Sequence, residues 1–177
     1  MTARLDTGLI QVYTGDGKGK TTCALGLALR AAGQGFRVYI IQFMKGRKTG
    51  ESCAVARLAP EVTLRYFGRG GLVNLRAPAA EDLALVQEAW ALARQVLAAG
   101  EHDLVILDEI NLALTHKLVP LEEALEALRR RPAGVEVVLT GRQAPPELVA
   151  MADLVTEMRP VKHYYQAGVK ARRGIEW

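Results

Sequence analysis

The stretch TGDGKGKTT (Thr14–Thr22) restricts the fold of this chain more than any other part of its 177 residues. It carries three glycines within five residues, follows the apolar run Leu9–Tyr13 and opens a helical stretch at Lys20. A glycine-rich turn between a strand and a helix directs backbone N–H groups and the helix dipole at a chain of phosphates. The stretch therefore predicts a nucleotide-binding loop in an α/β protein. A glycine- and lysine-rich surface turn is the disfavoured alternative.

The loop departs from the usual GxxxxGK[ST] pattern at its first position. Thr14 stands where that pattern has glycine, five residues before Gly19. We expect Gly15 to make the tight turn one residue later, Lys20 to supply a positive charge to the phosphates, and the Thr21 hydroxyl to bind Mg²⁺. The residues predicted to contact the nucleotide are Thr14, Gly15, Asp16, Gly17, Lys18, Gly19, Lys20, Thr21 and Thr22.

Short apolar runs alternate with longer helical stretches along the chain. Several runs are apolar at consecutive positions, which is typical of strands covered on both faces. The predicted strands are Leu9–Tyr13, Arg37–Phe43, Val62–Tyr66, Asp103–Asp108, Val135–Thr140 and Leu154–Met158. The predicted helices are Lys20–Ala32, Ala79–Ala99, Leu121–Arg131 and Pro145–Met151. This alternation predicts a single domain over residues 1–177, with an α/β fold whose mostly parallel sheet has helices on both faces.

Two segments, Lys45–Ala59 and Gly68–Pro78, show no clear period. Both follow predicted strands. Loops at strand ends carry most ligand contacts in open α/β sheets, so we expect these segments to line the site.

A second motif, LVILDE (Leu104–Glu109), resembles a Walker B strand that ends in a carboxylate. An acidic strand end is a weak signal alone, and it becomes much stronger in a chain that also has a phosphate loop. We assign Asp108 to the metal. Glu109 is either a second metal ligand or, in a hydrolase, the base that aligns water.

The sequence pattern alone does not decide the roles of three further residues. Arg142 follows the predicted strand Val135–Thr140, where a guanidinium either contacts phosphate or ribose or points into solvent. His163 and Glu176 lie in the C-terminal tail, and no spacing decides between a site role and a surface role for them.

Composition excludes several classes of protein. Cys23 and Cys53 are too few for a disulfide framework and have no CxxC spacing for zinc. The first residues lack the apolar core of a signal peptide, no apolar run reaches the length of a membrane span, and basic residues are not interleaved with aromatic ones. We therefore expect a cytoplasmic protein that binds neither membrane nor nucleic acid. The net charge of +4 suits an anionic ligand but carries little weight.

Taken as an ordered set, the motifs resemble one family, the P-loop ATP:corrinoid adenosyltransferases of cobalamin biosynthesis. The resemblance runs from Leu9 to Trp177. The stretches that carry it are TGDGKGKTT, QFMKG (Gln42–Gly46) with Gly50-Glu51, ILDEINLAL (Ile106–Leu114), LTGRQAP (Leu139–Pro145), ADLVTEM (Ala152–Met158) and the tail KHYYQAGVKARRGIEW.

The resemblance implies a RecA-like fold, a homodimer, and transfer of the 5′-deoxyadenosyl group of ATP to Co(I) of cob(I)yrinic acid a,c-diamide or cob(I)alamin. Triphosphate is the other product in that family, Mg²⁺ or Mn²⁺ is required, and a flavoprotein reductase is an expected partner. The family shares the altered loop opening and holds the triphosphate in the reverse sense, so that the ribose C5′ faces the corrinoid. By this likeness Arg142 and Glu176 join the nucleotide-binding residues, and Phe67, Gly68, Gly70 and His163 face the corrinoid.

Two departures from the family pattern concern the corrinoid end of the site. Family members often carry aromatic residues after the GxG that matches Gly68–Gly70, whereas Gly71, Leu72 and Val73 follow it here. Either Phe67 or Tyr66 takes the place of these aromatic residues, or the corrinoid is handled differently here. In the tail, His163-Tyr164-Tyr165 replaces a more usual His-Pro-aromatic pattern.

Alkyl transfer to Co(I) suits this set of residues. Co(I) is a strong nucleophile that needs no general base, so the task left to the protein is to stabilise the departing triphosphate and to align it. Two alternatives remain from the residues alone: an ATPase or small-molecule kinase that acts at the γ-phosphate, and a nucleotide-dependent switch without turnover.

Overall fold

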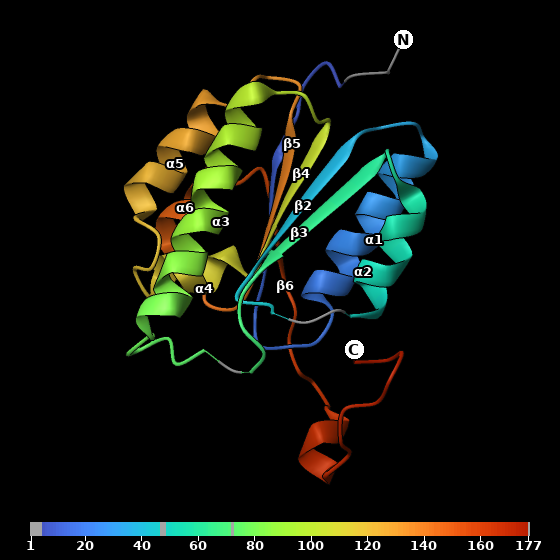
Figure 1. Cartoon of the computed structure of the whole chain (residues 1–177), viewed down its shortest axis with the longest axis vertical. Helices are drawn as coiled ribbons and strands as arrows, with labels where there is room; N and C mark the ends of the chain where they lie inside the picture. Colours follow the sequence, from blue (N-terminus) through green and yellow to red (C-terminus); the bar gives the residue numbers. More distant parts are fainter. Residues whose placement is uncertain (1–4, 47–48, 72, 177) are drawn as a thin grey trace.

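The computed structural model describes residues 5–46, 49–71 and 73–176. Its centre is one six-stranded sheet in the order β3-β2-β4-β5-β1-β6, and every neighbouring pair of strands is parallel. The strands are β1 (Ile10–Thr14), β2 (Val38–Phe43), β3 (Val62–Phe67), β4 (Leu104–Asp108), β5 (Glu136–Thr140) and β6 (Leu154–Glu157). Figure 1 shows them running side by side with the helices outside the sheet.

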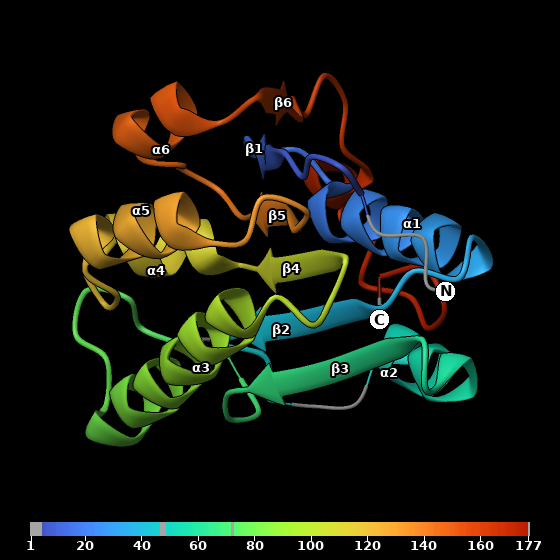
Figure 2. The ribbon, with the colours of Figure 1, turned by 90° about the horizontal axis from the view of Figure 1, so that it is seen from above.

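Helices cover both faces of the sheet, as Figure 2 shows. One face carries α3 (Ala80–Ala99), α4 (Ile110–Thr115), α5 (Leu121–Arg130) and α6 (Pro146–Met151). The other face carries α1 (Lys20–Gly33) and α2 (Gly50–Val55). Two short 3₁₀ turns, η1 (Ala56–Leu58) and η2 (Tyr164–Ala167), complete the described elements. The prediction of an α/β sheet with helices on both faces is therefore confirmed, with all pairings parallel.

The core follows from the apolar runs of the central strands. All five residues of β4 are buried, and they alternate between the two faces of the sheet. Val105 and Leu107 join the cluster under α3, α4 and α5, whereas Leu104 and Ile106 join the cluster under α1. Strand β6 is different, because it is the edge strand and all four of its residues are exposed.

Each predicted strand and helix begins and ends within one residue of its observed bounds. Two helices were not predicted. The segment Lys45–Ala59, expected to be a loop, contains α2 and η1, and α4 directly follows the Walker B strand. Each of the two α-helices has six residues, which is too short for a 3.6-residue apolar period to appear. In α2 the first turn is supported locally, since the Thr49 N–H donates to Ser52 Oγ (3.1 Å).

The parallel order brings the ends of distant segments to one edge of the sheet. Because β4 lies between β2 and β5, and β5 lies beside β1, the loops that follow these four strands meet there. Ligands in open α/β sheets bind in the crevice outside these carboxyl ends. In the described part of the chain, none of the helices has both the length and the apolar character that crossing a membrane requires.

Candidate active site

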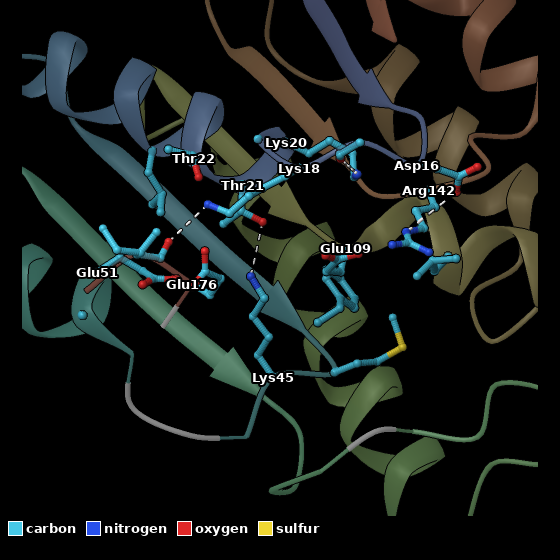
Figure 3. A pocket seen from close by; sticks show the side chains of 18 of the residues that line it. Asp16, Lys18, Lys20, Thr21, Thr22, Lys45, Glu51, Glu109, Arg142 and Glu176 are labelled. Carbon is cyan, nitrogen blue, oxygen red and sulfur yellow. Dashed lines mark hydrogen bonds and ion pairs between the residues drawn. The ribbon is translucent and has the colours of Figure 1, made fainter. Parts of the chain in front are cut away.

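A cavity of about 920 Å³ lies at the carboxyl edge of the sheet. Figure 3 shows side chains from the phosphate loop, from α2, from the end of β4 and from the tail pointing toward it. Its polar wall includes Lys18, Lys20, Lys45 and Arg142. Its apolar wall is made of Leu25, Phe43, Met44, Val73, Leu75, Leu112 and Ile175. One hollow thus joins a group of cationic side chains to an apolar surface.

The phosphate loop owes its shape to glycines and to the strand beside it. Gly15 and Gly19 have φ values of 93° and 123°, which side chains with a Cβ rarely adopt. At Gly15 and Gly17 a Cβ would lie 2.5 and 2.6 Å from the Met158 carbonyl oxygen, and the Gly17 N–H donates to that oxygen (2.7 Å). The main chain after β6 therefore supports the loop from behind.

Thr14 is the last residue of β1, so the turn of the loop begins at Gly15. The Thr14 hydroxyl accepts a hydrogen bond from the Ala144 N–H (3.2 Å). Residues 16–22 line the cavity, while Thr14 and Gly15 are outside its described lining. Thr14 thus ties the loop to the turn after β5.

Lys20 is the most enclosed cation of the site, at 8% exposure. Its ammonium donates to the carbonyl oxygens of Gly15 and Gly17, both at 2.7 Å. Burial lowers the pKa of Lys20, and the nearby Glu109 and Asp108 carboxylates oppose that shift. The ammonium is therefore held inside the curve of the loop, where a bound phosphate would meet it.

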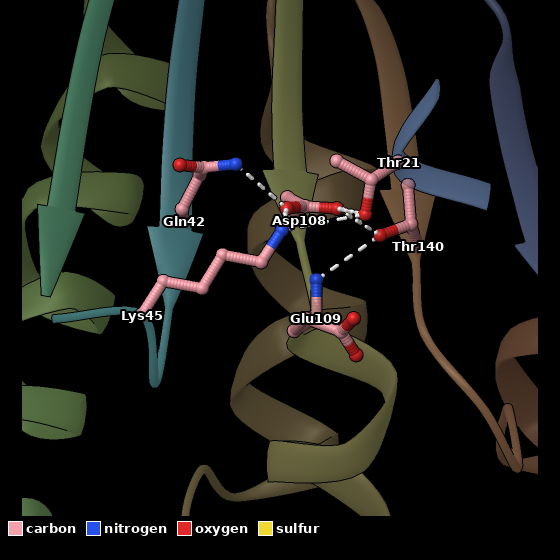
Figure 4. Close-up of polar contacts among 6 residues, drawn as sticks. All are labelled: Thr21, Gln42, Lys45, Asp108, Glu109 and Thr140. Atoms are coloured by element: carbon pink, nitrogen blue, oxygen red, sulfur yellow. Dashed lines mark hydrogen bonds and ion pairs between the residues drawn. The ribbon is translucent and has the colours of Figure 1, made fainter. Parts of the chain in front are cut away.

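Asp108 is the centre of a hydrogen-bonded cluster that Figure 4 shows. It is 1% exposed. Its Oδ1 accepts from Thr21 Oγ1 (2.8 Å) and Thr140 Oγ1 (2.6 Å). Its Oδ2 accepts from Gln42 Nε2 (3.0 Å) and Lys45 Nζ (2.5 Å). The structure thus joins the P-loop threonine to the Walker B aspartate. It adds Lys45, the first residue of a segment predicted to line the site, together with Gln42 and Thr140, to which the sequence alone assigned no role.

Glu109 follows Asp108 in a left-handed conformation (φ 67°) and caps α4. Its N–H donates to Thr140 Oγ1 (3.0 Å), which holds this turn against β5. Burial, together with the charge of Asp108, raises the pKa of the Glu109 carboxyl above its usual 4.5, although Lys45, Lys20 and Arg142 oppose the rise. The side chain lies on the cavity wall (Figure 3).

The raised pKa predicts how Glu109→Gln changes stability. The folded protein holds a proton on Glu109 at pH values where the unfolded chain has released it, so this residue destabilises the fold as pH rises. In the protein without metal or nucleotide, the variant should unfold roughly 2 °C higher than the parent at about pH 8. This difference in unfolding temperature should close as the pH falls toward 4.5, the usual pKa of a glutamate carboxyl. Thermal unfolding of the parent and the variant across this pH range measures the difference. A difference that is independent of pH would contradict the raised pKa of Glu109.

Figure 3 shows Arg142 beside Asp16, with Glu109 between it and Lys45. Its Nε is 3.8 Å from the Asp16 carboxylate, and both side chains are exposed. The turn that carries it is fixed by Asn111, whose amide donates to the Gly141 carbonyl (3.0 Å). Gly141 has a φ of 133°, and a Cβ there would lie 3.0 Å from Asn111 Cβ. The buried Asn111 thus positions the turn before Arg142.

The C-terminal tail returns to the cavity and contributes Gly174, Ile175 and Glu176 to its wall. The Glu176 carboxylate accepts from the Tyr164 hydroxyl and from the Arg172 main-chain N–H and guanidinium. These donors lower the pKa of Glu176 to about 2. Lys18 Nζ donates to the Ile175 carbonyl (3.2 Å), so the tail is attached to the phosphate loop.

Of the residues predicted to face the corrinoid, His163 lines the cavity. Its Nδ1 accepts from the Tyr165 N–H (3.1 Å). Phe67 packs against the core, and Gly68 lies against the main chain of Met44 and Lys45. Phe67, Gly68 and Gly70 are absent from the described lining, to which this segment contributes Gly71, Val73 and Leu75. Leu72, which follows the GxG, is outside the described residues.

The donor set at Asp108 fits Mg²⁺. The Thr21 hydroxyl and the Asp108 carboxylate are oxygen ligands in contact with each other, and Mg²⁺ is usually bound by one or two carboxylates together with substrate phosphates. Among the described residues, no three His, Cys, Asp or Glu side chains form a metal-binding group. The cluster therefore suits a metal that arrives with a nucleotide better than one caged by protein alone.

Residues 6–177 match the family described as ATP:corrinoid adenosyltransferase BtuR/CobO/CobP. The chain belongs to this family. Corrinoid adenosyltransferases of Pseudomonas aeruginosa PAO1 and Escherichia coli K12 are 41% and 39% identical to it, each over 99% of this chain and over 86% and 88% of the relative. The corrinoid adenosyltransferase CobA of Salmonella typhimurium LT2 is 38% identical over 99% of this chain and 88% of its own length.

A solved structure supports the fold of this adenosyltransferase. The KaiC-like protein PH0186 of Pyrococcus horikoshii OT3 superimposes with a TM-score of 0.51, over 86% of this chain and 74% of that one. At 16% identity the likeness concerns the fold alone. The family inferred from the motifs and the RecA-like α/β fold are thus both confirmed.

Proposed function

We propose that the chain transfers the 5′-deoxyadenosyl group of ATP to Co(I) of a reduced corrinoid. The cobalt electron pair forms the Co–C5′ bond, the C5′–O bond breaks, and its electron pair leaves with inorganic triphosphate. One observation carries the proposal: in a member of the adenosyltransferase family, a single cavity has Lys20 and Thr21 on its polar side and an apolar wall, and the Thr21 hydroxyl donates to the buried Asp108 behind it. Mg²⁺, which Thr21 and Asp108 would hold, supplies charge neutralisation for the triphosphate.

The side chains of the cavity suit a leaving group that gains negative charge. Lys20 is held at the loop carbonyls, Lys18 at the tail and Arg142 beside Asp16 at the start of the loop. Three cations on different sides of one space stabilise an anion without having to reorganise when charge develops. This arrangement supports the proposal that the triphosphate is the departing group.

The apolar wall suits the other substrate. Met44, Val73, Leu75 and Leu112 lie in the same cavity as the cations. A surface of this kind offers a contact for the body of a corrinoid and excludes water from the reacting carbon. With both substrates in place, the task of the protein is alignment of cobalt, C5′ and the leaving oxygen.

Product analysis tests the function against its alternatives. The protein is incubated with ATP, Mg²⁺ and chemically reduced cobalamin. We expect two products in equal amounts: inorganic triphosphate, and an alkyl-cobalt corrinoid that is identified by its light-sensitive spectrum. ADP and phosphate formed without corrinoid would instead identify an ATPase or kinase, and tight ATP binding without turnover would identify a switch.

Activity of Glu109→Gln separates the transferase from a hydrolase. Because Co(I) needs no base, adenosyl transfer at saturating Mg²⁺ should stay within about tenfold of the parent, whereas loss of a general base costs on the order of 10²- to 10⁴-fold. The measurement is the initial rate of alkyl-cobalt formation. A loss that disappears as Mg²⁺ is raised would identify Glu109 as a metal ligand, and one that persists at high Mg²⁺ would support base catalysis.

We also propose a homodimer that works in the cytoplasm with a flavoprotein reductase as the source of Co(I). The exposed edge strand β6 supports association, since Leu154 and Val155 are 44% and 41% exposed there. Light scattering of the purified protein measures the oligomeric state, with the mass of a dimer as the expected result.

A further inference from the structure

Lys45 is the cation that contacts the two oxygens of the candidate metal site. Its Nζ lies 2.5 Å from Asp108 Oδ2 and 3.4 Å from Thr21 Oγ1. Asp108 is almost fully buried, and the Lys45 side chain is 26% exposed. Figure 4 shows the lysine reaching from the end of β2 to the carboxylate beside Thr21. The lysine and a divalent metal would therefore use the same oxygens.

The main chain around Lys45 holds it at this position. Met44 has a left-handed conformation (φ 57°) that turns the chain at the end of β2, and the Lys45 N–H donates to the Phe67 carbonyl (3.1 Å). A Cβ at Gly68 would lie 2.6 Å from Lys45 N, and one at Gly46 would lie 2.1 Å from the Arg69 carbonyl carbon. The two loops are thus packed main chain against main chain, and Lys45 starts from a fixed point.

The other cations of the cavity have different partners. Lys20 donates to the loop carbonyls, Lys18 to Ile175, and Arg142 lies near Asp16. Lys45 alone among these four contacts Asp108 in the described structure. A lysine has a long flexible stem and a compact charge, so its ammonium can change partners without movement of the main chain.

We propose that Lys45 controls metal entry to the site. Its ammonium neutralises Asp108 in the free protein and competes with Mg²⁺ for Asp108 and Thr21. A bound triphosphate offers the ammonium another anionic partner in the same cavity, so Lys45 moves to the phosphates and leaves the two oxygens to the metal. Metal and nucleotide then bind together rather than one after the other. The inference rests on the proposed metal site and deepens it.

Binding of Mn²⁺ without nucleotide tests this directly, because electron paramagnetic resonance counts free and bound Mn²⁺. Lys45→Met keeps the stem and removes the charge. We expect it to bind Mn²⁺ at least about tenfold more tightly than the parent protein, since an uncompensated carboxylate attracts the metal more strongly. The same variant should bind ATP about tenfold less tightly in the presence of a chelator, because the triphosphate loses a cation. Lys45→Arg retains the charge and should keep Mn²⁺ binding weak.

The matched control is Lys18→Met, which removes the same charge from the same cavity but does not contact Asp108. It should weaken ATP binding and leave Mn²⁺ affinity within about twofold of the parent. If Lys18→Met tightens Mn²⁺ as much as Lys45→Met does, the effect is one of general charge and the proposal is wrong.

Adding Asp108→Asn to Lys45→Met shows whether the increase in Mn²⁺ affinity comes from binding at the Asp108 carboxylate. The double variant should bind Mn²⁺ no more tightly than the parent protein, and an increase in affinity that persists would overturn the proposal. Unchanged Mn²⁺ affinity in a folded Lys45→Met protein would overturn it as well. These measurements contain no corrinoid, so failure of adenosyl transfer in the product assay and failure of the Lys45 proposal are separate results.

Discussion

Lys20→Ala is expected to abolish use of ATP, with a fall in kcat/KM for ATP of roughly 10³-fold or more. The ammonium of Lys20 is buried within the loop, where it contacts the Gly15 and Gly17 carbonyls. Removal of this charge takes away the cation nearest to the predicted phosphate position. The rate of alkyl-cobalt formation as a function of ATP concentration measures the effect.

The same substitution also has a structural cost that must be separated from the catalytic one. Two carbonyls lose their hydrogen-bond donor, at about 1 kcal/mol each, so the variant should unfold a few degrees lower but remain folded at 25 °C. Lys20→Arg serves as the matched control, since it keeps the positive charge at the loop but replaces the compact ammonium with a larger, planar guanidinium. Turnover near that of the parent in a folded Lys20→Ala protein would refute the phosphate-loop assignment.

The sequence predicted the fold well because its main signals are local. Strand β4 is apolar at four consecutive positions and ends in an acidic residue, so both its burial and its end are evident from Leu104–Asp108. The phosphate loop is equally local, since Gly15 to Lys20 carry its turn and its charge within six residues. Helices α2 and α4 were missed because six residues cannot display a helical period.

The surroundings of Asp108 could not be predicted because they depend on strand order. Gln42 and Lys45 are more than sixty positions away in the chain, and they reach Asp108 since β2 pairs with β4. Thr140 arrives from β5 on the other side. The pattern QFMKG at the end of a predicted strand could have indicated the contacts with Asp108 only if the order of the strands in the sheet had been known. The tail is a different case, because Glu176 bonds to Tyr164 and Arg172 within the same segment, 12 and 4 positions away, but that segment has no period from which the contacts could be predicted.

Asp108→Asn is expected to lower adenosyl transfer by at least about 10²-fold, even at saturating Mg²⁺. Asparagine has the same shape, but it removes the charge, and its amide nitrogen is a donor in a cluster where Thr21, Thr140, Gln42 and Lys45 all donate to the carboxylate. In the variant, at least one of these four donors must therefore face the asparagine amide nitrogen, which is itself a donor. Breaking the pair with Lys45 should also destabilise the fold by about 2 kcal/mol, less than for a fully buried pair because Lys45 is partly exposed.

Two measurements separate these effects on Asp108. Denaturant unfolding of the protein without metal gives the loss of stability, and Mn²⁺ titration in the presence of ATP gives the loss of metal binding. Thr140→Val is the matched control, since it removes one hydrogen bond to Oδ1 and the acceptor of the Glu109 N–H but leaves the charge and the Thr21 contact in place. We expect it to cost about 1 to 2 kcal/mol of stability and to leave Mn²⁺ affinity within a few-fold of the parent. If Asp108→Asn responds to Mn²⁺ as the parent does, the metal lies elsewhere in the cavity, and the proposed roles of Thr21 and Lys45 at this carboxylate fall with it.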